Sequence, residues 1–179
     1  SFDLDAPTTN DVGTIAASTD GSIEYRDASA LTVGTVTTVG ITTTNDNVTL
    51  CATSLSLTQS ISFGTATLRL QASTGSVSQT GGSILGGVGS ALGVRGATGV
   101  SLPTATNDVD TFAADGGTGS VVFVDSDGYT LGTVAASGCF TPALTGISGT
   151  DFESCLTTGN LAVNAALTVT GTVRLQTGG

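Results

Sequence analysis

The side chains of this chain that are best suited to chemistry are carboxylates. The sequence holds 14 acidic residues against four arginines, and it contains no histidine and no lysine. The absence of histidine excludes the Ser/His/Asp arrangement and the commonest general base, and the absence of lysine excludes Schiff-base chemistry. Paired carboxylates remain for acid–base work, and the pairs are Asp108 with Asp110 and Asp125 with Asp127.

Both pairs lie in segments rich in Asn, Asp and Gly, where aspartate typically accepts hydrogen bonds from the backbone of a turn. The stretch "DSDG" at 125–128 begins like a calcium-binding loop. Such a loop needs further ligands and a distal bidentate glutamate, and none follows at that spacing. The matching stretch at 27–30 reads "DASA". We therefore predict turns at these places, no catalytic residue, no metal site and no cofactor.

The composition excludes several classes of partner. The net charge is -10, and only 10% of the residues are charged. Nucleic-acid binding needs a basic patch, which four scattered arginines do not provide, and an anionic membrane surface would repel so acidic a chain. No apolar run of about 18 residues is present, so we expect no membrane span. The chain opens at Ser1 without a signal peptide, so we expect a mature or excised form.

A long internal repeat organises the chain. Thr9–Val36 is matched by Thr106–Val134, at an offset of 97 residues at the start and 98 at the end. Farther along, "VTLCATS" matches "FESCLTT" and "ATLRLQA" matches "GTVRLQT". We therefore predict a single domain, 1–179, with repeat unit one at about 9–71, spacer coils at about 72–105 and repeat unit two at about 106–176.

Short runs of alternating apolar and polar residues recur between clusters of Gly, Asn, Asp, Ser and Thr, which indicates half-buried strands separated by turns. Short strands at close spacing fit either a β-sandwich or a β-solenoid. The long duplication, the scarcity of charge and the small residues favour the solenoid. We predict an all-β chain that forms a right-handed parallel β-helix, with roughly nine coils of about 20 residues each.

The three cysteines fall at informative places. Cys51 and Cys155 occupy equivalent positions of the two units, roughly five coils or about 24 Å apart along the rod, which is too far for a disulfide. Cys139 lies in a stretch that is six residues longer in the second unit. We therefore predict a Cys139–Cys155 disulfide, formed in an oxidising extracellular setting, and leave Cys51 as an intermolecular or free thiol.

A pair of valines forms a candidate contact patch. In the first unit Glu24 and Arg26 are expected to point outward, and by the same register Val122 and Val124 point outward in the second. Exposed apolar side chains of this kind serve as contacts with another chain or with a loop of the same chain. Cover by the neighbouring segment 135–158 is the competing interpretation.

The combined pattern "TNDV…AA…GS…D…LTVGTV…GITTTN…VTL…RLQ" resembles the strand-repeat regions of bacterial surface proteins of the filamentous-haemagglutinin type. The resemblance covers nearly the whole chain. It implies a secreted or cell-surface β-helical shaft used in adhesion, biofilm or filament assembly. It supplies no catalytic residue that could be transferred to this sequence.

From these observations we expect a non-enzymatic extracellular structural protein, either the shaft of a surface adhesin or the subunit of a head-to-tail filament. The alternative is a β-helix that binds or cleaves polysaccharide, for which 4% aromatic residues are few. Both ends resemble interior coils, since 1–12 is similar to 99–109 and the closing "VRLQTGG" corresponds to a point at which the first unit continues. The expected partners are therefore further copies of the chain or flanking repeats of a longer one, with surface polysaccharide as a further candidate.

Overall fold

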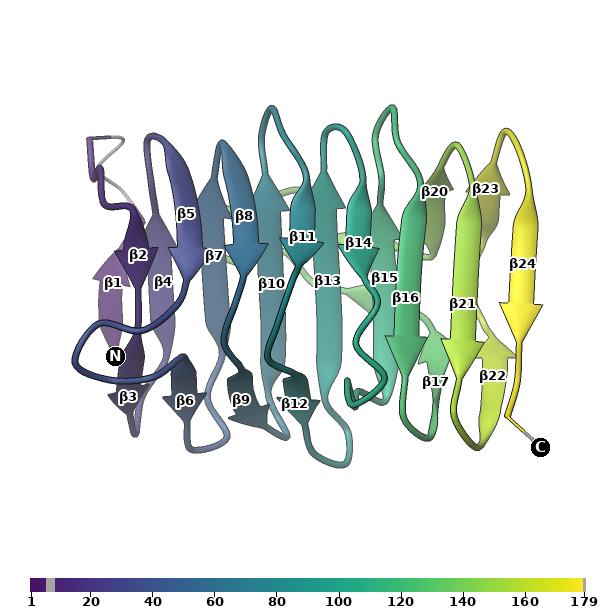
Figure 1. Cartoon of the computed structure of the whole chain (residues 1–179), viewed down its shortest axis with the longest axis horizontal. Coiled ribbons are helices and arrows are strands. Elements are labelled where there is room, and N and C mark those ends of the chain that lie inside the picture. The colour runs from purple at the N-terminus through teal and green to yellow at the C-terminus, as the bar shows by residue number, and fades with distance from the viewer. Residues whose placement is uncertain (6–8, 179) are drawn as a thin grey trace.

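A computed structural model describes residues 1–5 and 9–178 (Figure 1). Every element among these residues is a β-strand, and the strands of successive turns lie side by side in parallel. The chain climbs one face, crosses over and descends the next while it advances toward the C-terminus, which makes the winding right-handed. The predicted β-solenoid is confirmed. One of its faces holds eight strands, so it has about eight turns where we predicted roughly nine.

Three sheets form the faces of the solenoid. Sheet A contains, in order of stacking, β1 (Phe2–Leu4), β4 (Ile23–Arg26), β7 (Val48–Ala52), β10 (Thr67–Ala72), β13 (Ala91–Gly96), β15 (Thr111–Asp115), β17 (Gly128–Leu131) and β22 (Asn160–Val163), with β20 (Ile147–Gly149) and β23 (Leu167–Val169) continuing it beside β15. Sheet B contains β2 (Thr14–Ile15), β5 (Ala30–Val33), β8 (Ser54–Leu57), β11 (Val77–Gln79), β14 (Val100–Leu102), β16 (Val121–Asp125), β21 (Phe152–Leu156) and β24 (Val173–Gln176). Sheet C contains β3 (Ala17–Thr19), β6 (Ile41–Thr43), β9 (Ile61–Gly64) and β12 (Ile84–Gly86).

The alternation read from the sequence sets which side chains enter the core. In β4 the side chains of Ile23 and Tyr25 are buried, whereas those of Glu24 and Arg26 point outward. The register stacks like on like, so that Ile23 lies beside Val48 of the next turn and Tyr25 beside Leu50. Each fully buried aliphatic side chain contributes about 1.5–3 kcal/mol, and the stacked rows supply most of the stability.

The repeat encodes a corner that is built twice with the same hydrogen bonds. The Asn10 side-chain amide donates to the backbone oxygens of Leu4 (2.9 Å) and Arg26 (3.1 Å). The Asn107 amide donates to those of Leu102 (3.3 Å) and Val124 (3.2 Å). An asparagine at this position therefore ties two successive turns together in each copy.

An aspartate completes each corner. The backbone N–H of Val12 donates to the Asp27 carboxylate at 3.0 Å, and that of Val109 donates to the Asp125 carboxylate at 3.2 Å. Because these bonds join the same backbone groups in both copies, "TNDV" and the later aspartate recur for a structural reason.

The two copies occupy different faces of the solenoid. Strands β4, β7 and β10 of the first copy lie in sheet A, whereas their counterparts β16, β21 and β24 lie in sheet B. The second copy is thus turned about the axis by one face relative to the first. Residues that are equivalent in sequence consequently project on different sides of the rod.

Each copy contains one excursion that leaves the coil and returns to it. The first runs from Gly34 to Gly40 and the second from Gly132 to Gly146, and both close with an N–H···O bond of 2.8 Å between their glycines. Gly40 and Gly146 have positive φ angles of 65° and 70°. A Cβ at either would meet a backbone oxygen of the next turn, so glycine is required at both returns.

Candidate functional site: the strap over sheet A and the open coil ends

The longer excursion, residues 132–146, folds back over the outer face of sheet A, and we call it the strap. Its arms are β18 (Thr133–Val134) and β19 (Leu144–Thr145), which pair antiparallel. Its apolar side chains Val134, Phe140 and Leu144 are buried against small residues of the sheet, including Ala113. The strap therefore has a hydrophobic core of its own, separate from the one inside the coils.

Polar contacts fix the strap across several turns. The Arg69 Nε donates to the backbone oxygen of Ala135 at 2.8 Å, and an Arg95 Nη2 donates to that of Pro142 at 2.6 Å. The Arg95 guanidinium also lies 4.3 Å from the centre of the Phe140 ring, a cation–π contact. At the tip of the strap, the hydroxyl of Ser137 donates to the Glu24 carboxylate at 2.7 Å.

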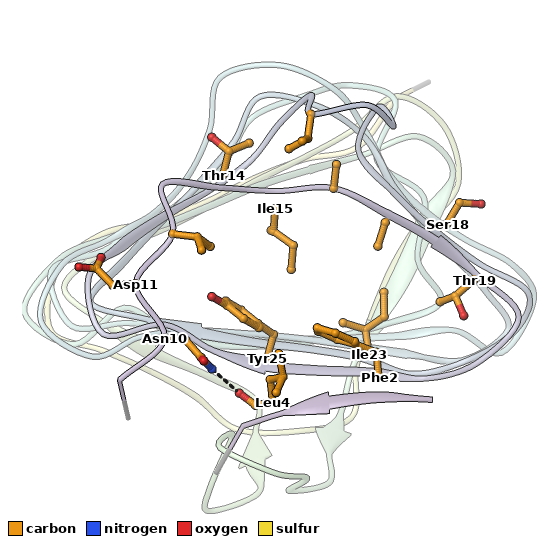
Figure 2. Close-up of a pocket in the computed structure, with 14 residues that line it drawn as sticks. Phe2, Leu4, Asn10, Asp11, Thr14, Ile15, Ser18, Thr19, Ile23 and Tyr25 are labelled. Carbon is orange, nitrogen blue, oxygen red and sulfur yellow. Dashed lines mark hydrogen bonds between the residues drawn. The ribbon is translucent and has the colours of Figure 1, made fainter. Parts of the chain in front are cut away.

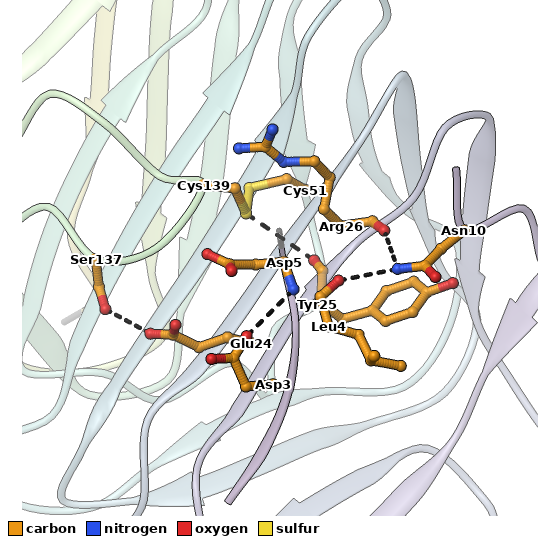
Figure 3. The surroundings of a disulfide bond; sticks show 10 residues. All are labelled: Asp3, Leu4, Asp5, Asn10, Glu24, Tyr25, Arg26, Cys51, Ser137 and Cys139. Carbon is orange, nitrogen blue, oxygen red and sulfur yellow. Dashed lines mark hydrogen bonds between the residues drawn. A yellow bond between two sulfur atoms is a disulfide. The ribbon is translucent and has the colours of Figure 1, made fainter. Parts of the chain in front are cut away.

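The disulfide joins Cys51 of β7 to Cys139 of the strap, with a Cα–Cα distance of 6.2 Å (Figure 3). The predicted Cys139–Cys155 bond is wrong, and so is the prediction that Cys51 is unpaired. The free thiol is that of Cys155, which is half-buried. The physical reason is the rotation of the second copy, because β21 carries Cys155 on sheet B while the strap lies on sheet A.

Gly93 of β13 creates the space in which the strap packs. A Cβ at this position would lie 2.8 Å from Val134 Cγ1 and 3.0 Å from Phe140 Cζ. We expect Gly93→Ala to lower the free energy of unfolding by about 1–3 kcal/mol through overpacking, measured by urea denaturation. The control is Gly13→Ala, where a Cβ would meet nothing within 4 Å and the change should stay within about 1 kcal/mol. Equal losses in both variants would contradict this account of the strap.

The four aspartates considered as acid–base pairs lie together at one corner, and two of them, Asp125 and Asp110, accept hydrogen bonds from the backbone. Asp125 is fully buried and accepts hydrogen bonds from the N–H groups of Asp127 and Gly128, so the predicted turn is confirmed. Asp110 accepts a hydrogen bond from the backbone of the loop that follows β12. Burial, together with the charges of Asp127 and Asp110, raises the pKa of Asp108.

The pKa values of the two corner aspartates, Asp125 and Asp27, are shifted in opposite directions. Burial raises the pKa of Asp125 to about 6, despite the backbone N–H groups that it accepts. Burial also acts on Asp27, but hydrogen bonds from the backbone of Val12 and Ser29 and from the Tyr25 hydroxyl outweigh it and lower the pKa below 3.8. The two environments therefore differ in the balance between burial, which dominates at Asp125, and hydrogen bonds, which dominate at Asp27 and include the hydroxyl groups of Tyr25 and Ser29.

Val122 and Val124 point outward from β16, as predicted, and are half-buried. In the register Val122 lies between Ser101 and Glu153, and Val124 lies beside Cys155. The strap covers a different sheet, so it does not cover these valines. Their role as a contact patch stays a prediction.

One group of carboxylates was missed from the sequence. Asp3, Asp5 and Glu24 bring their oxygens within 4.8 Å of one another beside the strap tip (Figure 3). Burial and the charges of Asp3 and Glu24 raise the pKa of Asp5. The grouping arises because β1 lies alongside β4 with Asp3 next to Glu24, a pairing between turns that no local motif announces.

No described residue covers the outer end of the first turn of the solenoid. Ile15, Ile23 and Tyr25 line a hollow of about 690 Å³ at this end. Figure 2 shows their side chains pointing into it. Phe2 and Leu4 of β1 also face the interior of the coil, yet they remain 46% and 36% exposed. These side chains are placed like those that interior turns bury against the next turn.

The last turn is open in the same way. Val173 and Leu175 of β24 lie beside the buried residues Phe152 and Ser154 of β21, and so they belong to the inward-facing rows. They are nevertheless 41% and 50% exposed, because no further turn covers them within residues 1–5 and 9–178. Both ends thus present strand edges together with core-type side chains.

No helix of the described residues is long and apolar enough to cross a membrane. Comparison of the chain with protein-family models, with curated proteins and with solved structures gives no match. The function is therefore argued from the open coil ends, the strap and the faces of the solenoid.

Proposed function

We propose that this protein is an extracellular structural β-solenoid: the shaft of a surface adhesin, or the subunit of a filament that grows head to tail. The observation that carries the proposal is the pair of open coil ends. Each end exposes apolar side chains in inward-facing rows, and a further turn stacked there would bury them and pair the strand edges. The resemblance of the repeat pattern to filamentous-haemagglutinin-type surface proteins supports the same assignment.

The disulfide supports an extracellular location. Disulfides persist in oxidising compartments and are rare in the cytosol. The Cys51–Cys139 bond ties the strap to a turn far from it in sequence, at a separation of 88 residues. In an oxidising environment this disulfide would stay intact, and it would hold the strap against the solenoid.

The distribution of aromatic side chains disfavours the polysaccharide-binding or polysaccharide-cleaving alternative. Sugar-binding grooves commonly present aromatic faces to the sugar rings. In this protein five of the six phenylalanines are fully buried, and both tyrosines are buried; the buried aromatic residues are Tyr25, Phe63, Phe112, Phe123, Tyr129, Phe140 and Phe152. Only Phe2 is exposed, and it lies at the open end.

Sedimentation and electron microscopy test the filament form of the proposal. The 17.4 kDa chain is expected to form species larger than the monomer as its concentration rises, and elongated particles should appear. Leu175→Lys places a charge in the inward-facing row of the last turn. Since burying an unpaired charge costs several kcal/mol, the concentration needed for assembly should rise at least tenfold.

Val88→Lys is the matched control, because Val88 is 88% exposed and does not lie on a terminal turn. It should assemble as the parent does. A parent chain that stays strictly monomeric at high concentration would overturn the filament form, and the shaft form would then rest on turns continued within a longer chain.

A further inference from the structure

The first and last turns of the solenoid correspond to strands of its interior that follow one another closely. In the first repeat unit Leu31 lies beside Leu55. In the second unit Tyr129 lies beside Leu161 in the same way, so β22 is the counterpart of β8. By the same comparison β23 and β24 are counterparts of β9 and β10. At the other end β1 is the counterpart of β14, and β2 is the counterpart of the start of β15.

One spacer turn separates these two sets of strands in the interior. Strand β11 lies between β8 and β14, and β13 lies between β10 and β15. The spacer continues the inward-facing rows, since Leu92 lies between Leu68 and Phe112. Because each row is a stack of residues from successive turns, leaving out one whole turn does not change which rows meet. The interior register therefore specifies how a first turn would stack directly on the last turn of a second molecule.

This register covers the apolar side chains that both ends expose. It places Phe2 over Leu161 of the second molecule, and Ile15 over Val173. Phe2 and Val173, which are 46% and 41% exposed, would then be buried. The faces of the solenoid agree with this arrangement, because β1 and β22 both belong to sheet A and β2 and β24 both belong to sheet B.

The short excursion at 34–40 is the counterpart of the strap, and it reaches beyond the first turn. Val36 corresponds to Val134, which is buried where the strap packs over β13 and β15. Val36 and Val39 are instead 63% and 60% exposed. Figure 1 shows the loop between β5 and β6 extending past β1 at the N-terminal end of the rod. A strand of a second molecule stacked on this end would lie within its reach.

An arginine of the last turn matches one that holds the strap. Arg174 of β24 corresponds to Arg69 of β10. The Arg69 Nε donates to the backbone oxygen of Ala135 in the strap at 2.8 Å. The Arg174 side chain is 65% exposed, and its ion pair with Glu153 is a surface contact that contributes little. With β24 beside β2 of the next molecule, Arg174 would lie beside residues 34–40 as Arg69 lies beside the strap.

We propose that the first turn binds the last turn of a second molecule of this protein in the register of the interior, and that residues 34–40 form a clasp over the outer face of that molecule's β24. On the outside Ala16 would lie beside Arg174 and Ser18 beside Gln176, so no like charges meet in these pairs. The contact joins unlike surfaces, so it repeats without closing. The inference rests on the filament form of the proposed function and adds the register and the clasp.

A cross-link between two molecules tests the register. Ser18→Cys and Gln176→Cys are made in separate chains, each with Cys155→Ser because Cys155 lies beside Gln176. Neighbouring strands are about 4.8 Å apart, within the range that a disulfide spans, so the mixed chains should form a covalent dimer in air. Thr14→Cys is the matched control. Figure 2 shows Thr14 and Ser18 both pointing away from the hollow, but four residues separate them, about 13 Å along a strand, so Thr14→Cys should not link to Gln176→Cys.

A valine substitution tests the clasp. Val36→Ser should raise the concentration needed for assembly about fivefold or more, because the apolar contact of the clasp is lost. Val88→Ser is the matched control, since Val88 is also exposed but lies on an interior turn, and it should assemble as the parent does. Neither substitution should alter the free energy of unfolding of the monomer by more than about 0.5 kcal/mol.

Sedimentation of the parent distinguishes failure of the register from failure of the filament. If the parent assembles but the link between positions 18 and 176 is absent, or forms equally from position 14, the register is overturned and the filament form stands. If Val36→Ser and Val88→Ser assemble alike, the clasp is overturned. A parent that stays monomeric at high concentration and gives no link would overturn this inference together with the filament form.

Discussion

Replacing Cys51 with serine is expected to lower the free energy of unfolding by about 4–5 kcal/mol. The disulfide closes a loop of 88 residues, and the chain-entropy estimate for a loop of that length is of this size. Urea denaturation under non-reducing conditions measures the loss. This is the largest single change that we expect in the molecule, because the bond ties the strap to a distant turn.

Two comparisons make the disulfide prediction specific. Cys139→Ser and the double variant Cys51→Ser/Cys139→Ser should each lose the same free energy as Cys51→Ser, since all three remove one bond. Cys155→Ser should change stability little, because Cys155 makes no disulfide. If Cys155→Ser instead destabilised the protein as strongly, the pairing described above would be refuted.

Asp125→Asn is expected to remove a pH dependence of stability. The folded protein holds the Asp125 carboxyl at a pKa of about 6, above the ordinary value of 3.8. As the pH rises from about 4 to about 6, the unfolded chain loses this proton first, so the folded state loses stability. The loss amounts to about 3 kcal/mol for the parent, from about 1.4 kcal/mol per pH unit.

Unfolding measured between pH 3.5 and 7.5 checks this, by subtracting the stability curve of Asp125→Asn from that of the parent. The slope is the readout, because asparagine also alters the bond from Val109. Asp27→Asn is the matched control from the other copy. Its pKa is lowered, so the contribution of Asp27 is present at neutral pH and is lost as the pH falls below about 4. If the stability of both variants relative to the parent changed with pH in the same direction, the opposite pKa shifts of Asp125 and Asp27 would be contradicted.

The core could be predicted from the sequence because it depends on alternation within single strands. Ile23 and Tyr25 point inward and Glu24 outward, as the period of two requires. The duplication was also evident, and the bonds of Asn10 and Asn107 explain it. These bonds join one turn to its neighbours, so they are the same whichever face of the solenoid the strands belong to.

The disulfide was predicted wrongly because the sequence pattern does not reveal on which face of the solenoid a strand lies. Alternation separates inside from outside, but it does not assign a strand to sheet A or sheet B. Cys51 and Cys155 are therefore equivalent in sequence and lie on different sides of the rod. The direction in which the strap folds depends on the space over Gly93, which only the packed sheet defines. The small residues at outward positions, such as Ala91 and Ala113, are the feature of the sequence that could have indicated that another segment packs on this face.

The Cys51–Cys139 bond also sets how a shaft of this kind would behave under tension. If opposing forces act on the two ends, the load passes from one cysteine to the other through the sulfur atoms and bypasses the intervening backbone. The 88 residues of that loop then bear no load and cannot be drawn out. At about 3.4 Å per residue, the intact disulfide prevents about 300 Å of extension, and reducing the disulfide would permit that extension. The middle of the rod is thereby mechanically shielded, and only the outer turns can yield.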